Sequence, residues 1–246
     1  VLLHQGQPEA AITELVKAVK ICPNSPDWWQ HLEDAFGAIA KPEKARMCRV
    51  YRLAYQSRHQ EAVEAFLADF TIDQIETYND CLLLYNCFFQ CGMVRQAVQT
   101  VERAATLKPD DQFLQVAPNL VLAPIYGSGS EMAAYRQRYL AAYDTLQQLL
   151  ETMASGALNV KAVENFTNFY LAYQGKGDRE VYACYGKLLH QVATERYPAL
   201  KLPVPVPPLS ANGKIRIAYI AESLGNNSET RWAVGWLKNH DRSQFE

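Results

Sequence analysis

The sequence predicts a mainly α-helical chain: a solenoid of helix hairpins, then a helical bridge, then the first strand, loop and helix of a truncated α/β domain. Three observations predict this. A set of spaced small residues occurs twice, apolar residues follow a helical period over most of the chain, and a proline-rich segment precedes a β-branched run. The 246 residues are 49% hydrophobic, which is enough for a sizeable core.

The repeated set identifies residues 1–110 as helix hairpins. A glycine lets the chain turn between two helices, alanines let the helices approach closely, and a proline ends the second helix. A middle copy supplies Trp29, Leu32 and Phe36 on a first helix and Ala45 after the turn. The two best copies share the offsets 5, 4, 3 and 5 and comprise Gly6, Ala11, Leu15, Ala18 and Pro23, then Gly92, Ala97, Val101, Ala104 and Pro109.

The array is predicted to be irregular in its middle. The two best copies lie 86 residues apart, which is not a multiple of a repeat of about 34 residues. Residues 58–80 are predicted to form another helix, with Phe70–Ile72 as its exit. Before the middle copy, Ser25-Pro26-Asp27 predicts a helix start at which the Ser25 hydroxyl accepts a hydrogen bond from a backbone N–H.

Residues 111–200 are predicted to form a helical bridge without a detectable repeat. Ser128–Glu131 reads as a capping box that opens a helix ending near Met153. A second helix is expected from Val160 to Tyr173, ending at Gly175, and a third from Asp178 to Tyr197. Their aromatic residues are interpreted as core packing. The side chains of Arg136 and Arg138 are expected to be solvated or paired with nearby acids.

The chain is predicted to change class after residues 201–213, a stiff linker that contains four prolines. Ile215–Ile220 is a β-branched run typical of a buried parallel strand. A loop follows at residues 221–228, and residues 229–239 are predicted to form a helix. Strand, loop and helix in this order open a doubly wound sheet. The side chains expected to be buried by that helix are Trp232, Ala233, Trp236 and Leu237.

Composition narrows the possible partners. The net charge of −2 provides no field that would recruit nucleic acid or an anionic membrane. No apolar run approaches the roughly 20 residues of a membrane span, so we expect a soluble, cytoplasmic protein. The six cysteines show no metal-binding spacing. Cys87 and Cys91 could share a helix face, and we interpret them as packing residues and expect no metal.

Several segments resemble a known enzyme family. The helix-hairpin pattern resembles the tetratricopeptide repeat. The strings Tyr135–Arg138, Thr167–Gly175, Asp178–Glu180 and Tyr185–Lys187 resemble the bridge of bacterial SPINDLY or O-linked N-acetylglucosamine transferase-type glycosyltransferases. Residues 214–246 resemble the start of the catalytic domain of that family.

The resemblance implies a protein O-glycosyltransferase that needs no cofactor beyond its donor substrate. The donor would be UDP-N-acetylglucosamine or GDP-fucose, and the acceptors would be Ser or Thr hydroxyls of proteins bound in the repeat groove. In this frame Val1 lies inside a helix and Glu246 leads into a second strand. We therefore expect a piece of a longer protein, inactive alone, because a second lobe binds most of the nucleotide.

The candidate site residues are Asn226 and Asn227. The first catalytic loop of the family carries Gly-Asn-His, and here Gly225-Asn226-Asn227 places an asparagine at the histidine position. An amide cannot accept a proton near neutral pH as imidazole does. Asn227 could still orient a donor phosphate or an acceptor by hydrogen bonds. Alternatively, the Asn-Asn-Ser run is only a turn and helix cap.

Two other functions stay open. The chain could be a non-catalytic adaptor that recruits proteins through its groove, or a pseudo-enzyme that kept the fold after losing the histidine. The ladder of asparagines that lines the groove in the family is not expected, because His31 and Leu83 stand at the corresponding places. The sequence carries no signal for an oligomeric state.

Overall fold

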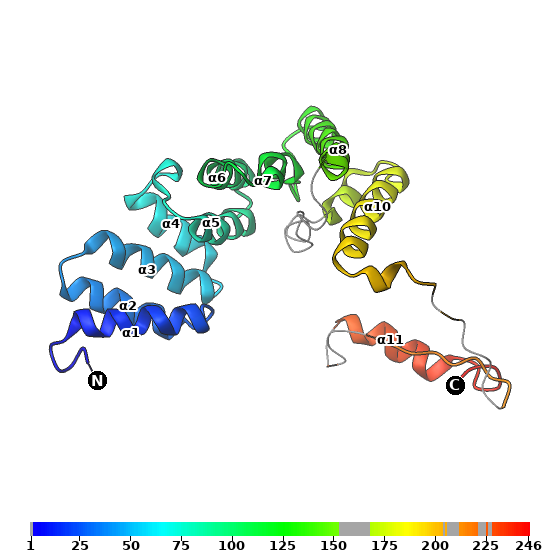
Figure 1. The fold of residues 1–246 in the computed structure, drawn as a ribbon, viewed down its shortest axis with the longest axis horizontal. Coiled ribbons are helices and arrows are strands. Elements are labelled where there is room, and N and C mark those ends of the chain that lie inside the picture. The colour runs from blue at the N-terminus through cyan, green and yellow to red at the C-terminus, as the bar shows by residue number, and fades with distance from the viewer. Residues whose placement is uncertain (1, 153–167, 204, 206–211, 221–224, 226–227) are drawn as a thin grey trace. The chain divides into compact units, whose positions relative to one another are not determined.

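The fold is mainly helical, as the sequence predicts (Figure 1). A computed structural model describes residues 2–152, 168–203, 205, 212–220, 225 and 228–246. The chain divides into two compact units, Val1–Pro198 and Ala199–Glu246, each with its own internal contacts. The α-helices are α1 (Pro8–Ile21), α2 (Pro26–Ala38), α3 (Pro42–Tyr55), α4 (His59–Asp69), α5 (Tyr78–Gln90), α6 (Val94–Leu107), α7 (Gln112–Val116), α8 (Gly129–Thr152), α10 (Arg179–Arg196) and α11 (Ser228–Asn239). The 3-10 helices are η1 (Ile72–Gln74), η2 (Ala117–Leu120), η3 (Phe169–Gln174) and η4 (Pro198–Lys201).

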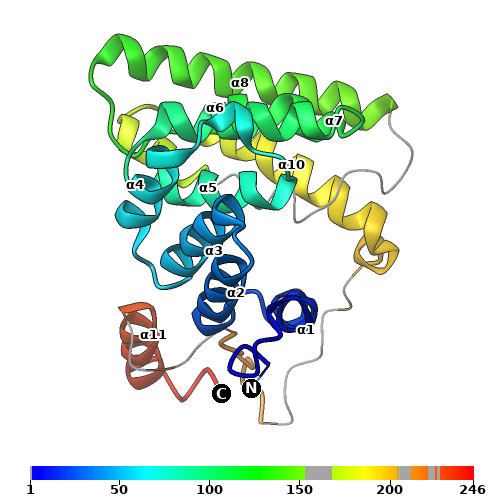
Figure 2. The same cartoon turned by 90° about the vertical axis from the view of Figure 1, so that its left-hand side faces the viewer.

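Helices α1 to α6 form a regular stack. Each of them packs on the next one along the chain, from α1 on α2 to α5 on α6 (Figures 1 and 2). Their first residues follow one another at intervals of 16 to 19 residues. Neighbouring units that contact each other in sequence order are the mark of a solenoid. The helical-solenoid part of the prediction is therefore consistent with the structure.

Four of the turns in this stack share one backbone conformation. Gly6, Ala40, Ser57 and Gly92 have φ angles of +69°, +52°, +58° and +72°. The N–H groups of Ser57 and Arg58 donate to Ala54 and Leu53, and those of Gly92 and Met93 donate to Phe89 and Phe88, at 2.8–3.0 Å. The left-handed residue thus satisfies carbonyl groups at the end of the preceding helix. Only two of these four positions hold glycine.

The shared turns explain the irregular offset between the two sequence copies. The left-handed residues lie 34, 17 and 35 residues apart along the chain. The interval from Ala40 to Ser57 is a single helix and its turn, rather than a hairpin. One extra half-repeat therefore lies between two ordinary ones, and it accounts for the 86-residue separation. The helix predicted within residues 58–80 is present as α4.

Helix α2 begins where the sequence predicts, but not by the predicted contact. Its N-cap is Ser25, whose side chain makes no capping hydrogen bond. Pro26 begins the helix, consistent with its fixed φ angle. The indole Nε1 of Trp29 donates to the Pro23 carbonyl oxygen at 2.7 Å and ties the first turn to the preceding segment.

Among the described residues of the helical unit, the buried side chains form three clusters. The first joins α1, α2 and α3 around Leu32, the second joins α3 to α6 around Phe66 and Phe88, and the third joins α5 and α6 to the bridge around Tyr139. Phe88 and Tyr139 are fully buried. Because the second and third clusters share helices α5 and α6, the stack and the bridge are parts of one continuous core.

The bridge contains the predicted third helix as α10. The start of α8 differs from the predicted capping box in one contact. The Ser128 hydroxyl accepts from the Glu131 N–H at 3.1 Å, as a capping box requires. The Glu131 carboxylate, however, accepts from the Gly127 N–H at 2.7 Å, one residue earlier than in the standard motif. The predicted helix over residues 160–173 lies partly outside the described residues. Its described end is the 3-10 helix η3, which stops at Gly175 with φ +62°.

In the unit Ala199–Glu246, the prediction of a buried strand at residues 215–220 is wrong. Ile215 forms a single isolated parallel bridge with Phe245, and the described residues contain no longer strand. The Ile215, Ile217 and Ile220 side chains are 50%, 41% and 95% exposed. A parallel strand is buried only when neighbouring strands and helices cover it, and here one short segment pairs with it. The predicted helix over 229–239 is present as α11, where Ala233 is buried but Trp236 is 62% exposed.

Candidate functional site

The two candidate residues from the sequence, Asn226 and Asn227, lie outside the described residues. Their flanks are described: Gly225 precedes them and α11 begins directly after them at Ser228. In the sequence, the two residues therefore directly precede the first turn of α11. In parallel α/β sheets, a loop at this place can present backbone N–H groups to a phosphate.

Backbone hydrogen bonds between residues 215–217 and 244–246 follow a parallel pattern. The Ile215 N–H donates to the Gln244 carbonyl at 2.9 Å, and the Glu246 N–H donates to the Ile215 carbonyl at 2.9 Å. The Ile217 N–H donates to the Glu246 carbonyl at 2.8 Å. Because α11 lies between the two paired segments in the chain, the unit has the order of a β-α-β crossover.

The helical unit contains a cleft of about 310 Å³ between α5, α6 and the start of α7. One wall is a single face of α5, because its five lining residues are spaced 3, 1, 3 and 1 positions apart. The opposite wall follows the end of α6, and α6 itself forms the floor. The lining side chains are Tyr78, Cys81, Leu82, Tyr85, Asn86, Thr100, Val101, Ala104, Asp111, Phe113 and Leu114.

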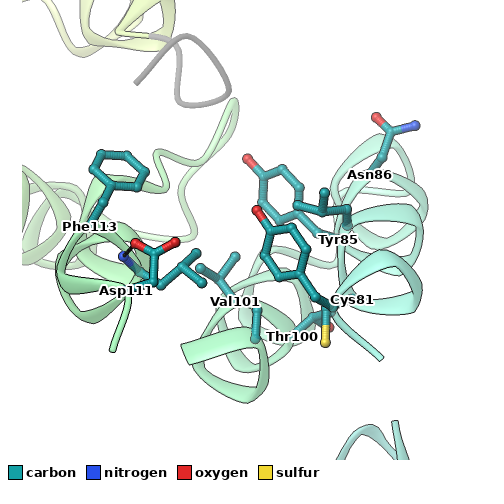
Figure 3. A pocket seen from close by; sticks show the side chains of 11 residues that line it. Cys81, Tyr85, Asn86, Thr100, Val101, Asp111 and Phe113 are labelled. Carbon is teal, nitrogen blue, oxygen red and sulfur yellow. Dashed lines mark hydrogen bonds between the residues drawn. The ribbon is translucent and has the colours of Figure 1, made fainter. Parts of the chain in front are cut away.

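Figure 3 shows the arrangement of the two walls. Tyr85 and Asn86 lie on one side, and Asp111 and Phe113 lie on the other, with Val101 of α6 between them. Asp111 is the N-cap of α7, where its Oδ1 accepts from the Leu114 N–H at 3.2 Å. The capping hydrogen bond holds the carboxylate at the edge of the cleft. Its fixed position makes Asp111 a candidate binding group.

The lining of the cleft contains three groups whose pKa is raised, and one carboxylate, that of Asp111. Burial, with a smaller contribution from Asp80, raises the pKa of the Cys81 thiol to about 11, so the thiol is neutral at physiological pH. Burial raises the pKa of Tyr85 to about 12. The pKa of Tyr78 is also raised, first by burial and then by the charge of Asp111. Among the described residues that line the cleft, Asp111 alone carries a charge.

A lysine outside the lining contacts one of the aromatic walls. The Lys108 ammonium nitrogen lies 3.9 Å from the centroid of the Tyr78 ring, which is a close cation–π contact. Lys108 follows α6 as its C-cap. The ring of Tyr78 therefore already attracts an ammonium group of the chain itself.

A second hollow, of about 680 Å³, lies beside α3, α4, η1 and α6 and carries more acidic than basic residues. Its charged groups link neighbouring elements. Arg46 lies 3.2 Å from the Asp69 carboxylate, Arg103 Nε donates to the Ile75 carbonyl at 2.9 Å, and the Tyr51 hydroxyl donates to Asp80 at 2.6 Å. These contacts hold the stack together, and we assign this hollow a structural role.

Arg136 is a structural residue rather than a solvated one. Its guanidinium Nη2 lies 2.7 Å from Asp178 Oδ1 and forms an ion pair with it. It also donates to the Gln174 side chain and to the Gly177 carbonyl, each at 3.0 Å. The side chains of Arg136 and Asp178 are only 15% and 11% exposed. Of the two predicted alternatives for Arg136, pairing with an acid is confirmed.

The described residues were also searched for a metal site and for membrane-spanning helices. Within the described residues, no group of three His, Cys, Asp or Glu side chains is placed to hold a metal ion. Cys87 is fully buried, and burial followed by the charge of Cys91 raises its pKa to about 12. None of the helices in the described part of the chain combines the length and apolar character that a bilayer span needs.

Comparison with family models, with curated proteins and with solved structures gives no significant match. The sequence resemblance therefore depends on the residues quoted for it.

The cleft was missed by the sequence prediction, although it left a signal. Tyr78, Leu82, Tyr85 and Asn86 share one helix face, but such a stripe is as typical of a core as of a binding surface. The residues Asp111 and Phe113 show that the stripe faces a cavity, and they come from another element. Only the packing of α7 beside α6 brings them together.

Proposed function

We propose that this chain is the acceptor-binding part of a protein O-glycosyltransferase. In this proposal the helical unit is a tetratricopeptide-like array that binds the acceptor protein. Residues 214–246 begin the α/β domain that handles the donor, UDP-N-acetylglucosamine or GDP-fucose. The donor domain as a whole requires further strands and a second nucleotide-binding lobe.

The observation that carries the enzyme proposal is the parallel pairing of Ile215 with Phe245 across α11. Parallel pairing requires a crossover connection, and that connection is usually a helix. An adaptor built only from helix hairpins has no need of such a unit. Ligands of parallel α/β sheets gather at the loops that follow the strands, which is where Asn226 and Asn227 lie in the sequence.

The helical unit supports the acceptor-binding part of the proposal. Stacked helix pairs form extended surfaces that bind other proteins, and the α5–α7 cleft is a recess on such a stack. Its lining combines aromatic, aliphatic and polar side chains, the mixture common in binding sites. The cleft would hold one side chain of the acceptor while the rest of the acceptor lies along the stack.

A transfer assay tests the enzyme proposal directly. The protein in which this chain occurs is incubated with labelled UDP-N-acetylglucosamine or GDP-fucose and with protein acceptors. We expect label on Ser or Thr residues with one of the two donors. No label with either donor, while the protein still captures its partners, would contradict the proposal.

Three asparagine variants locate the site within the same assay. Asn226→Ala is expected to reduce transfer at least tenfold if this amide orients the donor or acceptor. Asn227→His is expected to raise the rate if an imidazole base is what the site lacks. Asn239→Ala is the matched control, because its amide lies at the other end of α11 and donates to Gly235. Equal rates for all three variants would remove both residues from the site.

The second candidate function is a non-catalytic adaptor. The exposed side chains of Ile215, Ile217 and Ile220 favour it, because the first strand of a complete catalytic sheet would be covered. An adaptor would capture the same partner proteins without any transfer of sugar. The transfer assay and a partner-capture assay on one sample therefore separate the two candidates.

A further inference from the structure

We propose that the α5–α7 cleft binds the alkylammonium side chain of a lysine from the partner protein. This inference rests on the partner-binding role of the helical unit proposed above, and it does not depend on the transferase assignment. It specifies the chemistry of the side chain that the cleft recognises.

The lining of the cleft matches an alkyl chain that ends in a positive charge. Leu82, Val101 and Leu114 provide aliphatic surface for the methylene groups of a lysine. Tyr78 and Tyr85 provide aromatic rings, whose faces attract cations. The volume of about 310 Å³ is large enough for one such side chain.

The charge of the cleft also favours a cation. Asp111 is the charged group of the described lining, and its position is fixed by the capping hydrogen bond to Leu114. The Cys81 thiol stays neutral because burial raises its pKa to about 11. A bound ammonium would therefore find the negative charge of Asp111 beside the rings of Tyr78 and Tyr85, of which Tyr78 already contacts the Lys108 ammonium.

The same lining offers little to an anion. The Thr100 hydroxyl donates to the Gln96 carbonyl within its own helix at 2.8 Å. Lys108 is not among the lining residues, and its ammonium contacts the ring of Tyr78. A carboxylate or phosphate would face Asp111 without a lining cation to offset the repulsion.

The chain itself supplies an internal precedent for this recognition. The Lys108 ammonium lies 3.9 Å from the centre of the Tyr78 ring, on a wall of the cleft. Its positive charge opposes a second cation near the same ring. Lys108 should therefore weaken the binding of a lysine ligand, and removing its charge should strengthen it.

Three small probes test which property of the ligand the cleft recognises. One pair differs in the ammonium charge, and the other pair differs in the alkyl chain that carries it. The probes are Nα-acetyl-lysine-N-methylamide, the norleucine analogue that lacks the ammonium, and tetramethylammonium chloride. Binding of each to the 246-residue chain is followed by NMR chemical-shift changes of cleft residues. We expect the lysine probe to bind about three- to tenfold more tightly than the norleucine probe, the range of a partly desolvated cation–π contact. We also expect it to bind more tightly than tetramethylammonium, because only the lysine probe fills the aliphatic part.

Charge variants supply a matched series. Asp111→Asn keeps a residue that caps helices as well as aspartate does, so it removes charge without removing the cap. We expect this variant to lose most of the preference for lysine over norleucine. Asp110→Asn is the control, because Asp110 is exposed and does not line the cleft, and it should keep the preference. Lys108→Met should increase the preference.

Four outcomes would overturn the inference, and the first three concern the lysine and norleucine probes. These three are equal binding of the lysine and norleucine probes, an unchanged preference in Asp111→Asn, and shift changes that do not involve the cleft. Tighter binding of tetramethylammonium than of the lysine probe would also overturn it, in favour of a small-molecule ammonium ligand. Because no probe is a sugar donor or an acceptor protein, failure here leaves the transferase proposal standing. Failure of sugar transfer likewise leaves the lysine site standing.

Discussion

The helical unit and the unit Ala199–Glu246 differ in how many of their described apolar side chains are buried: nearly all of the buried ones belong to the helical unit. In the helical unit Leu84 and Phe88 are fully buried, whereas in the second unit Ile220 is 95% and Trp236 is 62% exposed. A helix hairpin covers its apolar face with the next hairpin along the chain. A parallel strand is covered only by several strands and helices that are distant in sequence. Packing between elements that are adjacent in sequence is therefore enough to bury the apolar side chains of the helical unit, but not those of the second unit.

The largest expected effect comes from the centre of the helical core. Phe88 packs edge-to-face against Phe66, with ring centroids 6.2 Å apart. We expect Phe88→Ala to lower the free energy of unfolding by about 3–5 kcal/mol, because it leaves a cavity in a packed core. In the second unit, Ile217→Ala should cost about 1 kcal/mol or less, since this side chain is 41% exposed. Urea denaturation followed by circular dichroism measures both, and equal effects would break the comparison.

The next effect concerns the polar contacts that join α8 to η3 and α10. Arg136→Met leaves the Asp178 carboxylate, 11% exposed, without its cation and removes the donor to Gln174. We expect a loss of about 2–3 kcal/mol in the free energy of unfolding. Arg58→Met removes an exposed ion pair with Glu61 and should leave the urea midpoint unchanged. If the two variants unfold at the same urea concentration, Arg136 is not the structural tie described above.

A smaller effect is expected at the hydrogen bond between α3 and α5. The Tyr51 hydroxyl donates to Asp80 Oδ1 at 2.6 Å. Removing it in Tyr51→Phe should cost about 1–2 kcal/mol at neutral pH. The measurement is again urea denaturation, and an unchanged midpoint would show that this contact contributes nothing to the stack.

The raised pKa of Tyr51 predicts that the stability of the chain decreases at alkaline pH. Burial, followed by the charge of Asp80, raises the pKa of Tyr51 well above its usual value. Above a pH of about 10, the unfolded state loses this proton while the folded state keeps it. The unfolded state then binds fewer protons, so stability falls as pH rises, by about 1.4 kcal/mol per pH unit for one tyrosine. Below that pH the contribution is complete. Tyr51→Phe should have a shallower decline between pH 10 and 11, and an identical decline would contradict this assignment.

The smallest effect tests the turns of the stack. Ser57 has a φ angle of +58°, in the left-handed region that favours glycine. We expect Ser57→Gly to stabilise the chain by about 0.5–1 kcal/mol and Gly92→Ala to destabilise it by about 1 kcal/mol. A Cβ atom at Gly92 would meet no atom within 4 Å, so the second variant tests the backbone alone. Thermal unfolding measures both changes, and a destabilising Ser57→Gly would show that the serine side chain has a role of its own.

Local signals in the sequence predicted much of the fold. Pro26 marked the start of α2, and the spacing after Asp178 marked α10. The left-handed turns at Ala40 and Ser57 could not be predicted, because neither residue has the backbone freedom of glycine. The tertiary packing imposes their conformation. As a result, the half-repeat that explains the irregular spacing became visible only in the structure.

The site was less predictable than the fold. Asn226 and Asn227 follow from the family resemblance and remain predictions. The cleft needs Tyr85 and Asp111, which lie on different elements and carry no joint sequence signal. The partner of Arg136 was hidden for the same reason, because Gln174 and Asp178 lie about 40 residues further along the chain.

The account depends most on the parallel pairing in the second unit, and backbone NMR of the labelled 246-residue chain tests it. We predict extended chemical shifts for Ile215 and Ile217, cross-strand contacts of these residues with Gln244 and Glu246, and slowed exchange of the Ile217 amide, as the hydrogen bonds of this pair require. Helical shifts at residues 215–220, or the absence of any contact with residues 244–246, would contradict the α/β assignment and favour an adaptor built from helices.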